Sequence, residues 1–204
     1  QMTPSQAMAA KIPVLDGETD TASLMAYGYD PELSSLSPYK GAMAAVIEAM
    51  SKLVAAGIDP KHAWLSFQEY FGRTGDNPEK WGKPFAALLG ALKAQAELEV
   101  AAIGGKDSMS GTFEDIDVPP TLIAFAVSTA KASHIITNEW KAKDHYIYAV
   151  MPEYDENGIV DFTSVRAVFD RVYSLIGSGC VKSACALEHG GTAEALLKCS
   201  LGNH

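Results

Sequence analysis

The chain has 204 residues with 16 Lys and Arg against 25 Asp and Glu, a formal net charge of −9. The length allows one domain or two small ones and is enough to bury a core. No cluster of basic residues could neutralise a phosphate backbone, and no apolar run approaches the roughly 20 residues that span a bilayer. We therefore expect a cytoplasmic protein with neither nucleic acid nor membrane as a partner.

Apolar periodicity predicts alternating strands and helices in the first two thirds of the chain. The helix from Pro38 is the clearest, because apolar residues recur at three- and four-residue spacing until Gly57. The lead-in of residues 1–38 has the composition of an extended segment. In chain order, the patterns predict a strand, a helix, a strand, a helix and two strands at residues 25–29, 38–57, 63–67, 84–98, 101–103 and 121–127. This order is typical of an α+β or α/β protein.

A boundary is expected near residues 128–134, where the apolar strand gives way to polar residues. Beyond it, the patterns predict a strand, a turn, a helix, a strand and a helix at residues 146–151, 155–158, 162–176, 181–186 and 190–202. The predicted domains are 1–128 and 129–204, and the second is small enough to need a neighbour for stability. The three cysteines, Cys180, Cys185 and Cys199, are interpreted as buried free thiols.

The glycine-rich loop at residues 104–111 is the most informative stretch for function. It combines backbone freedom, one cation, one carboxylate and two hydroxyls in Gly104, Gly105, Lys106, Asp107, Ser108 and Ser110. Glycines let a backbone approach a ligand closely, and the other side chains suit phosphate and magnesium. The spacing differs from that of a P-loop. The residues alone leave two interpretations open, an anion-binding loop and a polar hairpin turn.

Three other places carry weaker signals. Glu48 and Lys52 lie one helical turn apart and can pair, although a solvated surface pair is the simpler interpretation. Residues 188–191 precede the last helix, whose N-terminus could bind an anion or simply follow a tight turn. Residues 68–70 follow a predicted strand and could point into a cleft. No nucleophile and base arrangement is visible, so no catalytic residue is assigned.

Several motifs in order resemble the large, single-chain formylglycinamide ribonucleotide amidotransferases. They are the segments at residues 81–90 (WGKPFAALLG), 104–111 (GGKDSMSG) and 117–122 (DVPPTL). The resemblance implies an α+β fold like that of aminoimidazole ribonucleotide synthetase, a mixed sheet with helices on one face, followed by part of a second α/β domain. Residues 1–128 would be most of the second A half, and residues 129–204 the start of the second B half.

In that family ATP phosphorylates the amide oxygen of formylglycinamide ribonucleotide, and ammonia from glutamine displaces the phosphate. The resemblance implies ATP and magnesium as cofactors, Gly105 near ATP, Ser108 near the nucleotide substrate and Asp107 as a metal ligand. The remaining domains of the same polypeptide, a first synthetase copy and a glutaminase, would complete the active site. This chain alone is then expected to be inactive, to hold no nucleotide tightly and to self-associate.

The resemblance also implies a remnant of an auxiliary nucleotide site. Asp16 and Glu48 match two metal ligands of that site, whereas Lys52 stands where an asparagine is expected and Ala186 where an aspartate is expected. The hypothesis is that a Glu48–Lys52 ion pair replaces the magnesium-bound ADP.

Two other functions remain possible from the sequence. A free-standing acidic α/β binding or scaffold module without catalysis is the main alternative. An intact small ATP-dependent synthetase or kinase of the same fold is disfavoured, because the glycine- and aspartate-rich nucleotide loop of such chains is absent from the 204 residues.

Overall fold

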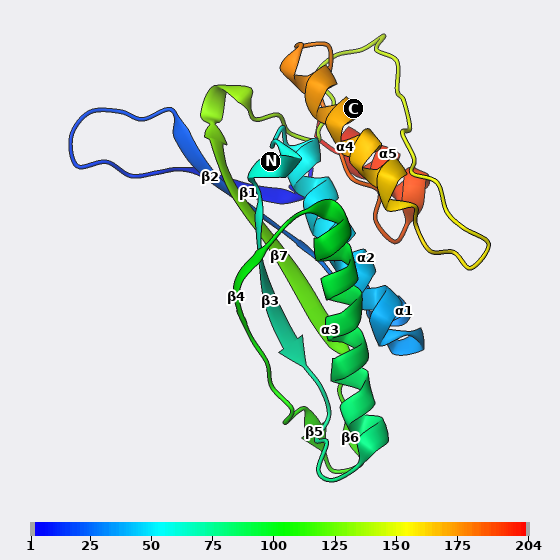
Figure 1. The fold of residues 1–204 in the computed structure, drawn as a ribbon. Helices are drawn as coiled ribbons and strands as arrows, with labels where there is room; N and C mark the ends of the chain where they lie inside the picture. Colours follow the sequence, from blue (N-terminus) through cyan, green and yellow to red (C-terminus); the bar gives the residue numbers. More distant parts are fainter. Residues whose placement is uncertain (1–2, 203–204) are drawn as a thin grey trace. The chain divides into compact units, whose positions relative to one another are not determined.

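The computed structural model describes residues 3–202, which form a mixed sheet with helices (Figure 1). In chain order the elements are β1 (Ala7–Lys11), β2 (Thr21–Gly28), α1 (Pro31–Leu36), α2 (Pro38–Ala55), β3 (Trp64–Tyr70), α3 (Pro78–Leu98), β4 (Ala102–Lys106), β5 (Thr112–Phe113), β6 (Ile116–Asp117), β7 (Thr121–Lys131), α4 (Phe162–Gly177) and α5 (Gly191–Ser200). The large sheet has the order β1-β2-β7-β3-β4, with β1 antiparallel to β2 and β3 parallel to β4. This confirms the predicted α+β class.

The chain divides into two compact units, each drawn from more than one segment. The first unit contains the residues up to Ala26, the segment Met50–Ala63 and the residues from Val127 onward, and the second contains Tyr27–Ala49 and Trp64–Ala126. The predicted division into residues 1–128 and 129–204 stays a prediction. Between residues 3 and 202, no helix has the length and apolar character needed to cross a bilayer.

Helix α2 supplies much of the buried apolar surface, as its sequence predicts. Its apolar positions recur every three or four residues and are almost fully buried at Ala42, Ala45, Val46, Ala49, Met50, Leu53 and Val54. The helix ends before Gly57, whose φ of 99° suits a residue without a Cβ atom. The predicted helix of residues 38–57 is therefore confirmed.

Helix α3 begins earlier than predicted, at Pro78 instead of Pro84. The Asn77 side chain accepts hydrogen bonds from the backbone N–H groups of Glu79 and Lys80 and caps the helix. Pro84 therefore lies inside the helix, where it removes one backbone donor without ending the helix. The Asn77-Pro78 pair is the N-terminal signal of this helix in the sequence, because asparagine is a common N-cap and proline is common at the first helical position.

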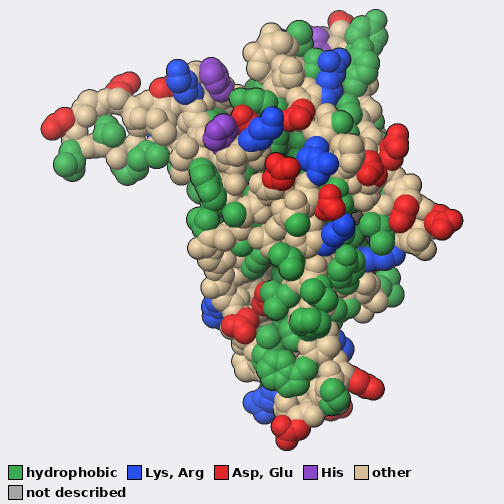
Figure 2. Space-filling model, in the orientation of Figure 1, with side chains coloured by type: hydrophobic (Ala, Val, Ile, Leu, Met, Phe, Trp, Pro, Cys, Tyr) green, Lys and Arg blue, Asp and Glu red, His purple; other side chains and the backbone are tan. Residues whose placement is uncertain are grey.

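Helix α3 is apolar on two sides. One side is buried at Pro84, Ala87, Ala91, Ala94 and Leu98. The other is a stripe of exposed large side chains, Trp81, Phe85, Leu88, Leu89 and Leu92. Apolar side chains gather over this helix on the face shown in Figure 2. A contiguous exposed stripe of this kind is typical of a surface that contacts another protein segment.

Two strands were wrongly predicted, and β1 and α1 were missed. Residues 146–151 and 181–186 form no strand, and Tyr146 and Tyr148 are 88% and 81% exposed. A strand needs a partner for its backbone groups, and within residues 132–202 the described pairing is a single bridge between Tyr154 and Val160. Strand β1 escaped prediction because its residues are mostly exposed and show no alternation.

The contact between α3 and the start of α2 yields a prediction about Gly90. A Cβ atom at Gly90 would collide with the Tyr39 backbone carbonyl, whereas one at Gly82 of the same helix would meet nothing within 4 Å. An alanine in a helix is ordinarily favoured over glycine by about 0.5–1 kcal/mol. We expect Gly82→Ala to raise the free energy of unfolding by that amount and Gly90→Ala to lower it by about 1–3 kcal/mol through overpacking. Urea denaturation of both variants measures the difference, and a stabilised Gly90→Ala would contradict the contact.

Candidate functional site

The loop at residues 104–111 runs beside β3 and its extension, held by backbone hydrogen bonds. Phe67 pairs with Gly105 in the parallel ladder, and Gln68 pairs with Lys106. Further on, the Phe71 N–H donates to the Ser108 carbonyl at 2.9 Å, and the Gly111 N–H donates to the Phe71 carbonyl at 2.9 Å. The segment is therefore extended, and the hairpin of this region lies further on, between β5 and β6. The polar-hairpin interpretation of residues 104–111 is wrong.

Gly105 allows β3 and β4 to approach closely. A Cβ atom there would lie 2.6 Å from the Phe67 carbonyl oxygen and 3.1 Å from the Phe67 nitrogen, whereas one at Gly104 would meet nothing within 4 Å. Any side chain at position 105 would therefore push the two strands apart. The structure gives Gly105 a role in strand pairing, in addition to the predicted role beside a ligand.

The polar side chains of the loop lie mostly in solvent, where a ligand could reach them. Lys106, Asp107 and Ser110 are exposed, and Ser108 is half-buried. The Lys106 ammonium lies over the Tyr70 ring at 4.9 Å from its centroid, close enough for a cation–π contact. The Ser108 and Ser110 hydroxyls are 2.8 Å apart. The structure thus brings the predicted loop residues into one short exposed segment.

Glu69 is a buried carboxylate beside this loop. It is 5% exposed and occupies a buried position of β3, in alternation with Leu65 and Phe67. Burial and the nearby charge of Asp107 raise its pKa from 4.5 to about 7. Glu69 lies within the segment at residues 68–70 that, by its sequence, could point into a cleft, but it was not singled out. The signal in the sequence is an acidic residue at a position where the strand's alternation calls for an apolar one, in register with Leu65 and Phe67.

Asp117 fixes the short β5–β6 hairpin to the start of α3. Its carboxylate accepts hydrogen bonds from the Thr112 hydroxyl and from the Lys80 ammonium, the latter at 2.9 Å. These hydrogen bonds hold the pKa of Asp117 below its ordinary value of 3.8. Asp117 is thereby engaged in the fold and is a poor candidate for binding a ligand.

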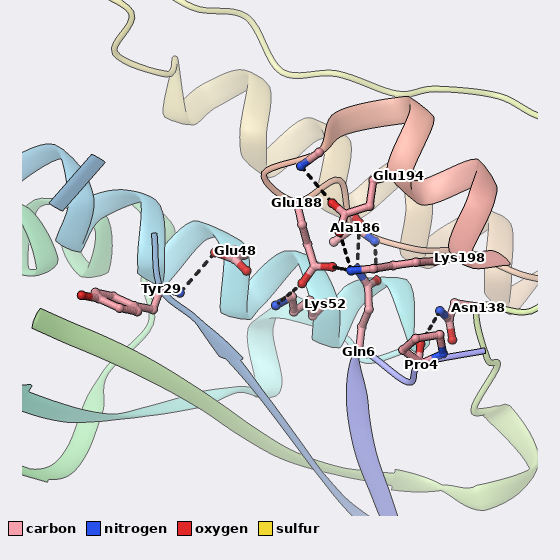
Figure 3. A network of polar contacts seen from close by, with 11 residues as sticks. Pro4, Gln6, Tyr29, Glu48, Lys52, Asn138, Ala186, Glu188, Glu194 and Lys198 are labelled. Atoms are coloured by element: carbon pink, nitrogen blue, oxygen red, sulfur yellow. Dashed lines mark hydrogen bonds and ion pairs between the residues drawn. The ribbon is translucent and has the colours of Figure 1, made fainter. Parts of the chain in front are cut away.

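Lys52 lies in a polar network of the first unit, shown in Figure 3. Its ammonium is 2.7 Å from a Glu188 oxygen, and its side chain is only 3% exposed. Lys198 bridges Glu188 and Glu194 at 3.2 and 2.6 Å. Burial tends to raise the pKa of Glu188, but its hydrogen bond to Lys52 and the Lys52 charge outweigh burial and hold the pKa below 4.5. The surface-pair interpretation of Lys52 is therefore wrong, and its carboxylate partner Glu188 was not foreseen.

Ala186 is held through its backbone by a side-chain amide. Gln6 donates to the Ala186 carbonyl at 2.9 Å and accepts from the Ala186 N–H at 2.8 Å (Figure 3). The two bonds satisfy both backbone groups of Ala186 without a neighbouring strand. Ala186 is therefore held by Gln6 although residues 181–186 form no strand.

The other two residues of the auxiliary-site remnant have different surroundings. A Glu48 oxygen accepts a hydrogen bond from the Tyr29 N–H at 3.2 Å, within the second unit. Asp16 is exposed in the connection between β1 and β2. The Glu48–Lys52 ion pair stays a prediction, and the ion pair described for Lys52 is with Glu188.

The three cysteines are free, but they are not all buried. Cys199 is buried, Cys185 is half-buried and Cys180 is exposed, so the prediction was wrong for Cys180. The Cys185 and Cys199 sulfurs are 3.5 Å apart. Burial and the neighbouring Cys199 raise the pKa of Cys185 to about 12, so its reactive thiolate form is scarce at neutral pH. Across residues 3–202, no group of three or more His, Cys, Asp or Glu side chains is placed to hold a metal ion.

Two curated archaeal proteins are similar to this chain in sequence. Phosphoribosylformylglycinamidine synthase subunit PurL of Methanocaldococcus jannaschii is 25% identical over 194 residues, covering 83% of this chain and 26% of that protein. The subunit of the same name from Haloarcula marismortui is 30% identical over 107 residues, covering 51% of this chain and 14% of that protein. The chain thus spans about a quarter or less of these relatives. No protein-family profile matches it.

Solved structures of PurL from Thermotoga maritima share the fold. The complex with AMPPCP is 17% identical, with a TM-score of 0.66, and the match covers 85% of this chain and 27% of that chain. The complex with FGAR is 14% identical, with a TM-score of 0.63, and the match covers 85% and 26%. The chain therefore has the fold of part of PurL, in agreement with the mixed sheet described above.

The buried Lys52–Glu188 pair predicts unequal effects of two similar substitutions. Glu188→Gln would remove the charge that lies 2.7 Å from the buried Lys52 ammonium, and breaking a buried pair in this way costs about 3–5 kcal/mol in comparable cases. Glu194→Gln removes one partly exposed charge beside Lys198 and keeps an oxygen that can accept the hydrogen bond from the Gly190 N–H, so it should change stability much less. Adding Lys52→Met to Glu188→Gln should recover most of the loss, because no buried charge then remains. Chemical denaturation measures all three variants, and equal losses for Glu188→Gln and Glu194→Gln would contradict the buried pair.

The raised pKa of Glu69 predicts how stability depends on pH. The unfolded chain releases this proton near pH 4.5, whereas the folded chain releases it near pH 7. The contribution of Glu69 to stability is therefore complete below about pH 4.5 and is lost as the pH rises to about 7, by at most about 3 kcal/mol. Glu69→Gln should remove this part of the pH dependence, and the exposed Glu114→Gln should retain it. Denaturation midpoints between pH 4.5 and 8 measure the effect, and identical profiles for wild type and Glu69→Gln would refute it.

Proposed function

We propose that this chain is part of a larger ATP-dependent synthetase that converts formylglycinamide ribonucleotide to formylglycinamidine ribonucleotide with glutamine-derived ammonia. The observation that carries the proposal is the sequence similarity to PurL over 83% of the chain. The fold shared with PurL structures that hold AMPPCP or FGAR supports it. The motif order at residues 81–122 favours the large single-chain type, although both curated relatives are separate subunits.

We assign the contribution of this chain to the loop at residues 104–111. The Lys106 ammonium and the Ser108 and Ser110 hydroxyls can donate hydrogen bonds to phosphate oxygens, and the backbone at Gly104 has open space above it. Gly105 keeps this segment against β3. Asp107 is the proposed ligand for magnesium, which when bound spreads the charge of the phosphoryl group being transferred. No nucleophile or general base is assigned here, so we expect no turnover from the 204 residues alone.

The remaining parts of the active site would come from the rest of the same polypeptide, a first synthetase copy and a glutaminase. Exposed apolar surface in the second unit supports this proposal, because another domain of the polypeptide would bury it. Besides the α3 stripe, the part of the large sheet in this unit exposes the large apolar side chains of Tyr27, Trp64, Tyr70 and Ile103. Without that domain, the chain is expected to self-associate through this surface.

Nucleotide binding by the loop can be tested with the chain by itself. A ligand at ten times its Kd raises the free energy of unfolding by about 1.4 kcal/mol, which is about 3–6 °C in Tm for a chain of this size. We expect ATP with magnesium at millimolar concentration to give such a shift in wild type. Lys106→Ala should reduce the shift, because it removes a cation from the loop, and Lys93→Ala, an exposed lysine on α3, should not. Equal shifts in both variants, or none in wild type, would argue against the assigned loop.

A further inference from the structure

Glu69 is a buried acid for which the fold supplies no partner. Its side chain follows Leu65 and Phe67 on the buried face of β3, and 95% of its surface is removed from solvent, since only 5% is exposed. Among the described residues, no hydrogen bond or ion pair engages its carboxylate. Burying an ionised carboxylate without compensation is costly. A group that destabilises the fold in this way is most readily explained by a ligand that it binds.

A second carboxylate lies beside it. Gln68 pairs with Lys106 in the parallel ladder, so the next positions, Glu69 and Asp107, are neighbours at the carboxyl ends of β3 and β4. Paired residues of adjacent strands point to the same face of a sheet. The carboxyl ends of parallel strands are the usual place for ligand binding in open α/β sheets.

The nearby lysine does not neutralise this pair. Lys106 lies one position before Asp107, so its side chain leaves the opposite face of the sheet. There it contacts the Tyr70 ring, which is also one position away from Glu69. Asp107 is exposed, whereas Glu69 is not, so the two carboxylates form a site that opens to solvent on the Asp107 side.

We propose that Glu69 and Asp107 together bind one divalent cation, Mg²⁺, at the carboxyl ends of β3 and β4. Mg²⁺ usually takes one or two carboxylates, keeps several waters and shares phosphate oxygens of a substrate. Two carboxylates without a third protein ligand fit this preference and do not fit a closed zinc or calcium cage. The cation also removes the repulsion between the two acids. The metal site stands on these residues alone, while its contact with a nucleotide phosphate rests on the proposed function.

Glu69 has two possible roles, that of a metal ligand and that of a purely structural acid, and the two roles predict different behaviour. As a structural acid, Glu69 would simply stay protonated at low pH and would bind nothing. As a ligand, it loses its proton when the cation enters, and both carboxylates are needed. A probe that reports metal binding without any enzymatic turnover therefore decides between the two roles.

Mn²⁺ is a suitable probe, because its free form is counted directly by electron paramagnetic resonance and its oxygen preference resembles that of Mg²⁺. We expect the 204-residue chain at pH 8 to bind one Mn²⁺ that Mg²⁺ displaces. Glu69→Gln and Asp107→Asn should each weaken binding at least tenfold, and Asp115→Asn, an exposed acid of the β5–β6 turn, should leave it unchanged. Absence of Mn²⁺ binding at millimolar concentration, or equal affinity in Glu69→Gln and wild type, overturns the proposal.

Thermal melting of the same variants tests whether a loss of Mn²⁺ binding is caused by a loss of folding. In metal-free buffer at pH 8, Glu69→Gln should melt higher than wild type, because a buried unpartnered charge is gone, and it should no longer respond to Mn²⁺. Because Asp107 is exposed, Asp107→Asn should melt at the same temperature as wild type in metal-free buffer. Mn²⁺ binding at these residues without any shift by ATP would leave the metal site standing and sink the proposed function. If ATP gives the same melting shift in wild type and Glu69→Gln, and the two bind Mn²⁺ with the same affinity, the metal site is refuted and the proposed function stands.

Discussion

The close parallel pairing of β3 with β4 positions the chemistry of the second unit. It depends on a glycine at position 105, where any Cβ atom would crowd the Phe67 backbone. Because the two strands run side by side, the last residues of β3 lie beside the residues that follow β4. Glu69 is next to Asp107, and the Phe71 N–H donates to the Ser108 carbonyl. The position of the loop at residues 104–111 is therefore set by its backbone hydrogen bonds to β3 and to Phe71.

Within residues 3–202, the two buried charged side chains, Lys52 and Glu69, have opposite surroundings. Lys52 is neutralised inside the fold by Glu188, so the fold is satisfied without any ligand at that position. Glu69 has no such partner and depends on its proton, or on a cation, for compensation. A buried carboxylate with a shifted pKa is a candidate for function, whereas a compensated charge is explained by the fold alone. The ion pair with Glu188 gives Lys52 a structural explanation that needs no ligand.

Local sequence signals predicted the parts of the fold that local physics determines. The periodicity of α2 and the apolar runs of β3 and β7 are properties of short segments, and each was found at the expected place. The predictions of strands at residues 146–151 and 181–186 were wrong, because a strand forms only where a second strand pairs with it, and a local pattern does not reveal that partner. Among the site residues, the loop was recognised from composition, whereas the Lys52–Glu188 contact joins positions far apart in the chain and leaves no local pattern.

The buried ion pair also constrains how this sequence can change over time. A chain that keeps Lys52 but loses Glu188 loses the carboxylate 2.7 Å from a buried ammonium, and the reverse change leaves a partly buried carboxylate with weaker support. Either single substitution passes through a less stable intermediate, while a joint replacement by uncharged residues of similar volume does not. Positions 52 and 188 should therefore covary among homologues, with both charged or both neutral, and this covariation would identify the pair even without a structure.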